Sequence, residues 1–217
     1  MTARRTRIRR NARRAVYDRP IIDAVLDREL LCHVAYVNDG EPRIIPTLYI
    51  REGDTLYLHG NRQSALLAHI AAGEPVSIGV TLLDGIVVAR SAFHCSVNYR
   101  SVTLFGRGHL LADDVAIAVL DRFVERLIPG HLSHLRASTP QELAATAVVA
   151  VAIEECAAKI RTGDPIDDDG DLAAPVWAGV IPVQRTTGQP VPSADLHAGI
   201  TLPAYIDGWQ YPDAVDA

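Results

Sequence analysis

Cysteine is scarce in this 217-residue chain, which holds only three. Cys32, Cys95 and Cys156 are far apart, odd in number and set among apolar residues. Secreted domains that depend on disulfides have even numbers of cysteines in a dense framework. The sequence therefore predicts reduced, buried thiols, and no pair has the spacing of metal ligands.

Long hydrophobic runs are also missing, and none approaches the roughly 18 residues that cross a bilayer. Residues 1–14 are polar and rich in arginine, and no apolar stretch follows them as it does in a secretory signal. Hydrophobic residues make up 48% of the chain and charged residues 22%, as in ordinary globular proteins. We expect a cytoplasmic protein with no membrane partner.

Several cofactor and catalytic motifs are absent. The chain has no glycine-rich dinucleotide fingerprint, no P-loop and no nucleophile elbow. His131 and His134 are three residues apart, but no cysteine or carboxylate cluster accompanies them. The acidic residues 164–171 fail the calcium-loop pattern, because aligning Gly170 with its invariant glycine puts Pro165 at the first ligand position. The sequence predicts no metal site.

Lysine occurs once, as Lys159, so arginine supplies almost all of the positive charge. Residues 1–20 hold eight arginines and one acidic residue, Asp18, whereas the whole chain has a net charge of −5. This basic start suits either nucleic-acid binding or a solvated arm that packs on an acidic neighbour. No aromatic residues alternate with the arginines and no recognition-helix pattern follows, so we favour the arm.

The hydrophobic pattern predicts short strands joined by tight turns. A helix begins at Asp18 and Pro20, and Pro46 indicates an edge strand or a bulge. The expected strands are residues 31–37, 43–50, 55–59, 75–82, 86–96, 100–111 and 147–160. Asp84-Gly85 predicts a hairpin turn, and residues 65–72 and 113–127 predict helices. Residues 139–142, Thr-Pro-Gln-Glu, predict a capping box with proline at the first helical position.

These elements predict a mainly β protein with flanking helices and six to seven antiparallel strands. Tight turns between successive strands favour a closed barrel over an open sheet with exposed edges. We expect three regions: a basic arm at residues 1–17, a barrel domain at 18–185 and a Pro/Gly-rich tail at 186–217 that packs on the surface.

The segment that ends in Gly60, Asn61, Arg62, Gln63 and Ser64 passes from a strand through a polar loop into a helix. Free N–H groups at the helix start, the Ser64 hydroxyl and the Arg62 guanidinium suit a phosphate. The same residues equally suit a polar helix cap. Both interpretations stay open from the residues alone.

Two long strands are expected to meet at a turn formed by residues 98–101. Arg100 and Ser101 lie where a second contact to an anion can form. The alternative is a hairpin whose arginine faces water.

Together these residues resemble the pyridoxamine-phosphate-oxidase-like flavoproteins, and within them the branch that includes nitroimidazole-resistance proteins. The resemblance is carried, in order, by residues 17–18, 42–46, 56–60, 84–85, 91–94, 98–102, 106 and 175–182. It spans roughly residues 10–185. It implies a split β-barrel, a homodimer and FMN bound between the subunits.

The resemblance also implies roles for single residues. Ile45, Pro46, Thr47 and Leu48 would run beside the isoalloxazine ring and offer it backbone groups, and residues 60–64 would take the phosphate. Arg100 and Ser101 would approach the flavin from a neighbouring strand, and Trp177 would close the cleft.

One departure concerns the phosphate. The oxidases proper place an Arg-Lys pair there, where this chain has Arg62, Gln63 and Ser64. One expected cation is missing, which predicts weaker FMN binding.

We therefore expect an FMN-dependent oxidoreductase that acts on a small molecule, with the cofactor carrying the redox step. His59 is the side chain expected near the reactive face, or else a capping histidine at a strand end. The alternatives are a non-catalytic flavin- or haem-binding split-barrel module and a deazaflavin-dependent reductase. Residues 1–14 are expected to be dispensable for FMN binding, since the strand pattern begins only near Leu31.

Overall fold

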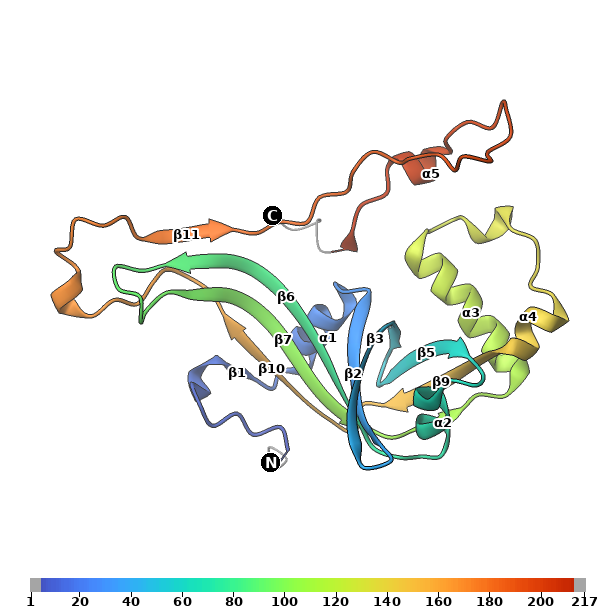
Figure 1. Ribbon diagram of the computed structural model, residues 1–217, viewed down its shortest axis with the longest axis horizontal. Helices are drawn as coiled ribbons and strands as arrows, with labels where there is room; N and C mark the ends of the chain where they lie inside the picture. The colour runs from blue at the N-terminus through green and yellow to red at the C-terminus, as the bar shows by residue number, and fades with distance from the viewer. Residues whose placement is uncertain (1–4, 213–217) are drawn as a thin grey trace.

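The computed structural model describes residues 5–212, which form two antiparallel sheets wrapped around one core. The larger sheet has the order β1-β10-β7-β6-β2-β3, with β11 paired to β6, and the smaller has the order β4-β5-β9-β8. Figure 1 shows the long strands β6 and β7 extending well beyond the smaller sheet and its helices. The sheets do not close into a full cylinder, so the closed barrel favoured by the tight turns was wrong, whereas the split barrel implied by the family resemblance is confirmed.

The strands are β1 (Ala15–Val16), β2 (Leu31–Asn38), β3 (Glu41–Leu48), β4 (Ile50–Glu52), β5 (Thr55–Asn61), β6 (Val76–Val88), β7 (Ser96–Gly106), β8 (Gly108–Leu110), β9 (Thr146–Ala152), β10 (Glu155–Arg161) and β11 (Gly179–Pro182). The helices are α1 (Arg19–Asp27), α2 (Ala65–Ala71), α3 (Asp113–Leu127), α4 (Pro140–Ala145) and α5 (Ala204–Asp207). Short 3₁₀ turns cover Ala12–Arg14, Leu132–His134 and Asp169–Asp171.

Three expected strand boundaries were wrong, because the chain bends from one sheet into the other without a turn sequence. Tyr49 separates β3 from β4, Arg107 separates β7 from β8, and residues 153–154 separate β9 from β10. In each case one apolar run supplies a strand to both sheets, and periodicity alone cannot show the corner.

Two expected turns were also wrong. β6 runs straight through Asp84 and Gly85, where only a register shift marks the predicted hairpin. Residues 98–101 lie inside β7 rather than at its end, and the true connection is residues 89–95. Glycine at position 85 is required by close approach rather than by a turn, since a Cβ there would lie 3.0 Å from Val180 and 3.1 Å from the Ile181 carbonyl oxygen.

Most of the core fills the space between the sheets. It includes Val34, Leu58, Ile78, Leu104 and Val149, all fully buried or nearly so. A second cluster, formed by Ile50, Val119, Phe123 and Val148, packs α3 against the side of the smaller sheet that points away from the main core. Among residues 5–212, no helix lies over the other face of the larger sheet (Figure 1).

Local signals for helices were accurate. α1 begins after Asp18, although the Asp18 side chain makes no capping bond. α4 shows the predicted capping box: Thr139 Oγ1 accepts from the Glu142 N–H, and Glu142 accepts from the Thr139 N–H. Cys32 is buried as expected, but Cys95 is exposed, so the expectation of three buried thiols was wrong for it. No helix among residues 5–212 is long and apolar enough to cross a membrane.

The tail returns to the barrel and is held there by polar contacts. Trp209 Nε1 donates a hydrogen bond to the Leu127 carbonyl oxygen at 2.6 Å. The Tyr211 hydroxyl donates to the carboxylate of Glu29, which also accepts from the Leu30 N–H and pairs with Arg185 at 2.6 Å. Glu29 is buried, so its carboxylate is the central anchor of the tail.

Replacing Glu29 with Gln is expected to release the tail. Burial alone would raise the pKa of Glu29, but hydrogen bonds from Tyr211, Arg185 and Leu30 outweigh it and hold the pKa below 4.5. A lowered pKa stabilises the folded state above the unfolded value of 4.5 and loses that contribution as the pH falls through the folded value. At neutral pH, the variant should be cut by trypsin after Arg185 about ten times faster, since exposed chain is the preferred site of cleavage. Glu41→Gln, an exposed carboxylate, is the control and should be cut at the parent rate.

Candidate functional site

The face of the larger sheet that points away from the core is apolar and open. On β2, Cys32, Val34 and Tyr36 face the core, so Leu31, His33, Ala35 and Val37 face outward. The paired residues of β3 on this side are Pro42, Ile44 and Pro46. Leu31 is 47% exposed, Val37 58% and Ile44 65%. We call this surface the outer face.

Small side chains continue the outer face across the sheet. One row of paired residues runs from Pro46 through His33, Gly79 and Thr103 to Ala157. A Cβ added to Gly79 would meet nothing within 4 Å, so the space above Gly79 is open. Ala157, at the end of the row, is buried and lines a cavity together with residues of the N-terminal arm.

The N-terminal arm borders the outer face on the β7–β10 side. The Arg5 guanidinium lies 5.0 Å from the centre of the Phe105 ring and pairs with Glu155 at 2.6 Å. Residues 6–8 of the arm, together with Ser101 and Thr103, line a cavity of about 220 Å³. This part of the arm packs on an acidic neighbour, as the sequence predicted.

β3 is the edge strand of the larger sheet, as Pro46 predicted. Ile45, Pro46, Thr47 and Leu48 pair with β2 on one side and have no strand on the other within residues 5–212. Along an edge strand the backbone groups point alternately toward the paired strand and away from it, so every second residue is open to a partner or a ligand, and Pro46 has only its carbonyl oxygen to offer. That is the condition under which they can serve a flavin ring.

The predicted phosphate loop is already committed to other contacts. Arg62 donates from Nε to the Ala144 carbonyl oxygen at 3.0 Å, and from Nη2 to the Thr146 carbonyl oxygen at 3.0 Å and to Asp113 at 3.1 Å. Asn61 Oδ1 accepts from the Gln63 N–H at 2.8 Å. Ser64 precedes α2 without a capping bond from its side chain. Gly60 and Asn61 lie within β5, so the loop is shorter than expected.

His59 lies on the smaller sheet, under α3, and not on the outer face. Its ring packs edge-on against Phe123 with centroids 4.3 Å apart, and its Nδ1 atom is buried without a hydrogen-bond partner among residues 5–212. Burial lowers the pKa of His59, which favours the neutral imidazole.

Arg100 and Ser101 point to opposite faces of β7, because successive side chains of a strand alternate. Arg100 forms an ion pair with Asp84 at 2.6 Å. Ser101 is on the outer face, where its hydroxyl donates to the Lys159 carbonyl oxygen at 3.2 Å. Trp177 precedes β11, is 63% exposed and lies against Gly179.

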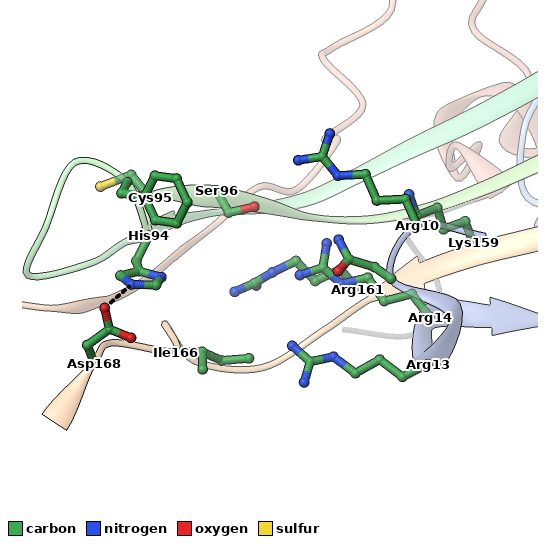
Figure 2. Close-up of a pocket in the computed structure, with 12 residues that line it drawn as sticks. Arg10, Arg13, Arg14, His94, Cys95, Ser96, Lys159, Arg161, Ile166 and Asp168 are labelled. Carbon is green, nitrogen blue, oxygen red and sulfur yellow. Dashed lines mark ion pairs between the residues drawn. The ribbon is translucent and has the colours of Figure 1, made fainter. Parts of the chain in front are cut away.

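A cationic cavity of about 580 Å³ lies where the arm meets the ends of β7 and β10. Its positively charged residues are Arg10, Arg13, Arg14, Lys159 and Arg161. Figure 2 shows the arginines on one side of the cavity and His94 and Asp168 on the other.

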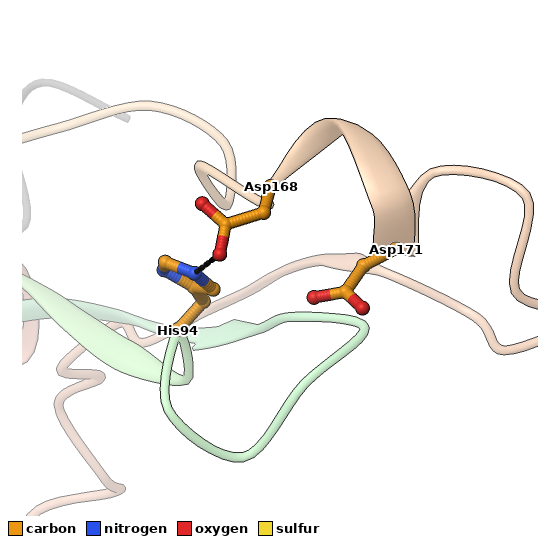
Figure 3. Close-up of side chains that lie close together, drawn as sticks. All are labelled: His94, Asp168 and Asp171. Atoms are coloured by element: carbon orange, nitrogen blue, oxygen red, sulfur yellow. Dashed lines mark ion pairs between the residues drawn. The ribbon is translucent and has the colours of Figure 1, made fainter.

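His94 and Asp168 belong to a small cluster at the rim of the cationic cavity. His94 Nε2 lies 3.2 Å from a carboxylate oxygen of Asp168. The ligand atoms of His94, Asp168 and Asp171 all lie within 4.8 Å of one another (Figure 3). Exposed acidic groups of this kind are common without a metal, and Asp168 is largely exposed, so the cluster by itself does not indicate a metal site.

The structure thus brings together some predicted site residues and separates others. Pro46 and Ser101 share the outer face, and the β3 backbone lies at its edge. Three other predicted parts of the site do not lie on the outer face: the β5–α2 loop, Arg100 and Trp177. Sequence reasoning missed the cationic cavity, because the arginines of the arm and Arg161 become neighbours only through the pairing of β1 with β10.

Comparisons with known proteins agree with this fold. Residues 18–160 match the family model described as pyridoxamine 5'-phosphate oxidase. The flavocytochrome Anf3 from Azotobacter vinelandii is 39% identical, with 94% of this chain and 95% of that chain covered and a TM-score of 0.89. A FAD- and haem-binding protein from Mycobacterium smegmatis is 42% identical, with coverages of 91% and 98% and a TM-score of 0.87.

A protein from Bacteroides thetaiotaomicron, assigned to 5-nitroimidazole antibiotic resistance, shares the fold. It is 17% identical, with coverages of 67% and 86% and a TM-score of 0.57. A search among curated proteins found no significant match. The family model covers well over half of the chain, and two solved structures resemble it at about 40% identity over nearly their whole length. The chain belongs to the pyridoxamine 5'-phosphate oxidase family.

Proposed function

We propose that this protein is a redox protein that binds a flavin and a haem. The observation that carries the proposal is its 39% and 42% identity, over more than 90% of each chain, with a flavocytochrome and with a FAD- and haem-binding protein. This proposal extends the expected flavin-dependent oxidoreductase to an electron-transfer protein with two cofactors. The flavin supplies two-electron chemistry and the haem one-electron chemistry.

The outer face suits the flavin. An isoalloxazine ring is flat and mostly apolar, and beyond His33 the row consists of the small residues Gly79, Thr103 and Ala157. The open edge of β3 supplies backbone groups for the polar rim of the ring, as expected for Ile45, Pro46, Thr47 and Leu48, with Pro46 offering only its carbonyl oxygen. The sequence predicts FMN, whereas the relative that is 42% identical is named for FAD. We therefore propose that the flavin is FAD, and the first measurement is to identify the bound flavin.

The haem needs an axial ligand, which in proteins is most often a histidine. His33 is exposed in the middle of the apolar outer face, flanked by Leu31 and Ala35 on β2 and opposite Pro46 on β3. His69 is bonded to the Pro75 carbonyl oxygen, and His131 to the Tyr205 hydroxyl. Of the histidines within residues 5–212, His33 best combines exposure with an apolar surface for a porphyrin, and we propose it as the ligand.

A homodimer would cover the outer face. Leu31, Val37 and Ile44 together expose more apolar surface on one sheet face than single scattered residues do. β3 is also an apolar edge strand, which proteins usually cover or pair. A second copy of the chain, with cofactors between the two faces, accounts for both features.

The proposal is tested on protein purified from cells supplied with a haem precursor. The absorption spectrum should contain both a flavin band and a haem Soret band, and mass spectrometry of the heat-released ligand should give FAD. Adding NADH or NADPH should bleach the flavin and then shift the haem bands. Protein that takes up neither flavin nor haem after reconstitution would contradict the proposal, and recovery of FMN alone would restore the original expectation of the cofactor.

Replacing Ile44 with Asp is expected to convert the dimer to a monomer. The change places a charge on the proposed interface, where an unpaired buried charge costs several kcal/mol. The molar mass measured by light scattering at micromolar concentration should fall from about twice the chain mass of 23.5 kDa to the mass of one chain. Val191→Asp, at a residue 89% exposed in the tail, is the matched control and should stay dimeric. A parent protein that is monomeric while holding its cofactors would contradict the dimer.

A further inference from the structure

The cationic cavity carries more positive charge than its surroundings balance. Three arginines of the arm, Arg10, Arg13 and Arg14, line it together with Lys159 and Arg161, against one carboxylate, Asp168. Asp168 itself lies beside His94. No ion pair or side-chain hydrogen bond of Arg10, Arg13 or Arg14 is found within residues 5–212. Five cations that converge on a cavity with a single carboxylate repel one another unless an anion joins them.

Arg161 makes this imbalance more costly, because only 5% of its surface is exposed. Its guanidinium donates to the Asn98 side chain and to the carbonyl oxygens of Gly163 and Asp164, all uncharged groups. Its Nε atom is buried without a partner among the described residues. Burial, together with Arg14 and Arg13, lowers the pKa of Arg161. A buried arginine with no carboxylate is stabilised by an anionic ligand.

The cavity is continuous with the outer face. Ala157, Lys159 and Arg161 alternate along β10 and share one of its faces, so the small-residue row leads directly to the cations. Phe93, whose side chain is 90% exposed, also lines the cavity. An exposed aromatic ring beside clustered arginines suits a base that stacks next to phosphates.

We propose that this cavity binds the diphosphate of a nucleotide, with the arm arginines and Arg161 on the phosphate oxygens and Phe93 beside the base. A volume of about 580 Å³ exceeds what a single phosphate fills and falls within the range of small-molecule sites. Arginine binds phosphate oxygens in pairs through its planar fork. The committed contacts of Arg62 leave this cavity as the stronger phosphate site of the chain.

Two kinds of molecule could bring a nucleotide diphosphate to this cavity, and the experiment distinguishes between them. The diphosphate belongs either to FAD itself, which rests on the proposed function, or to a separate nucleotide that donates electrons. ADP, pyrophosphate and adenosine are titrated calorimetrically into full-length protein before and after FAD loading. ADP and pyrophosphate should bind to the unloaded protein at least ten times more tightly than adenosine, and their affinity should fall as salt rises.

Arg13→Gln is the test variant and Arg9→Gln the matched control, because Arg9 is an exposed arginine of the same arm that does not line the cavity. Arg13→Gln should weaken ADP binding about tenfold, the usual effect of one charge-assisted contact, and Arg9→Gln should leave it unchanged. Both positions are exposed, so neither change threatens folding; Arg161→Gln is added with a thermal melt to confirm that it folds.

Competition with FAD shows which molecule supplies the diphosphate. If FAD loading blocks ADP, and Arg13→Gln weakens FAD but not riboflavin, the cavity holds the cofactor's own diphosphate. If ADP still binds FAD-loaded protein and Arg13→Gln weakens only ADP, it holds a separate nucleotide. Equal affinities of ADP and adenosine, or equal effects of Arg13→Gln and Arg9→Gln, overturn the proposal. Those outcomes leave flavin and haem content untouched, so they are distinct from a failure of the proposed function.

Discussion

Replacing His33 with Ala is expected to abolish haem binding while flavin binding persists. A bound porphyrin would keep its apolar contacts, but its iron would lose the nitrogen proposed to hold it, and the Soret band of purified protein should fall at least tenfold. The flavin ring does not need an imidazole, so flavin content should stay within about twofold of the parent. Pyridine haemochrome analysis and flavin release measure the two cofactors in the same sample.

The control for His33 is His109→Ala. His109 is an exposed histidine on β8 of the smaller sheet, away from the outer face, so its loss should change neither cofactor. His33→Gly with added imidazole provides a second test, because a free ligand can restore a missing axial bond but cannot repair a damaged fold. Retention of the Soret band in His33→Ala, with its loss in His131→Ala, would move the haem to the loop between α3 and α4 and contradict the assignment.

Much of the fold could be predicted because local chemistry decides it. The Pro46 edge strand, the α3 helix and the Thr139–Glu142 capping box each depend on residues that are close in the sequence. The resemblance to the oxidase family was confirmed because its motifs kept their order along the chain. The corners between the sheets were missed, since Tyr49 and Arg107 look like ordinary strand residues and only tertiary packing bends the chain there.

The site was harder to predict than the fold. A turn was expected at residues 98–101 because Asn-Tyr-Arg-Ser contains turn-forming residues, but pairing with both β6 and β10 keeps them extended. That pairing sends Arg100 and Ser101 to opposite faces. The arm was expected to pack on an acidic neighbour, because no aromatic residues alternate with its arginines and no recognition-helix pattern follows. β1 also pairs with β10, however, and brings Arg13 and Arg14 beside Arg161. Charge that converges only after folding leaves no local signal.

The corner at Gly106 leads to the largest expected effect on stability. β7 passes into β8 across residues 106–108, and β9 crosses directly over this point. A Cβ at position 106 would lie 2.0 Å from the Ala152 carbonyl oxygen and 3.1 Å from Val151. A Cβ at position 108 would lie 2.5 Å from the Ala150 carbonyl oxygen. The carbonyl oxygens of Ala150 and Ala152 are backbone atoms of a paired strand, so they cannot rotate away as a flexible side chain would.

Gly106→Ala should therefore destabilise the protein by about 3 kcal/mol, the upper end of the usual cost of overpacking, because the strand that carries Ala152 must move. Urea unfolding at fixed protein and cofactor concentration measures the change, since bound cofactors and subunits add to apparent stability. Gly170→Ala is the matched control: a Cβ there meets nothing within 4 Å, and its free energy of unfolding should stay within about 0.5 kcal/mol of the parent. If Gly106→Ala matched Gly170→Ala, the two sheets would not meet as closely at this corner as the structure requires. The continuity of β7 from the outer face into the smaller sheet would then need another explanation.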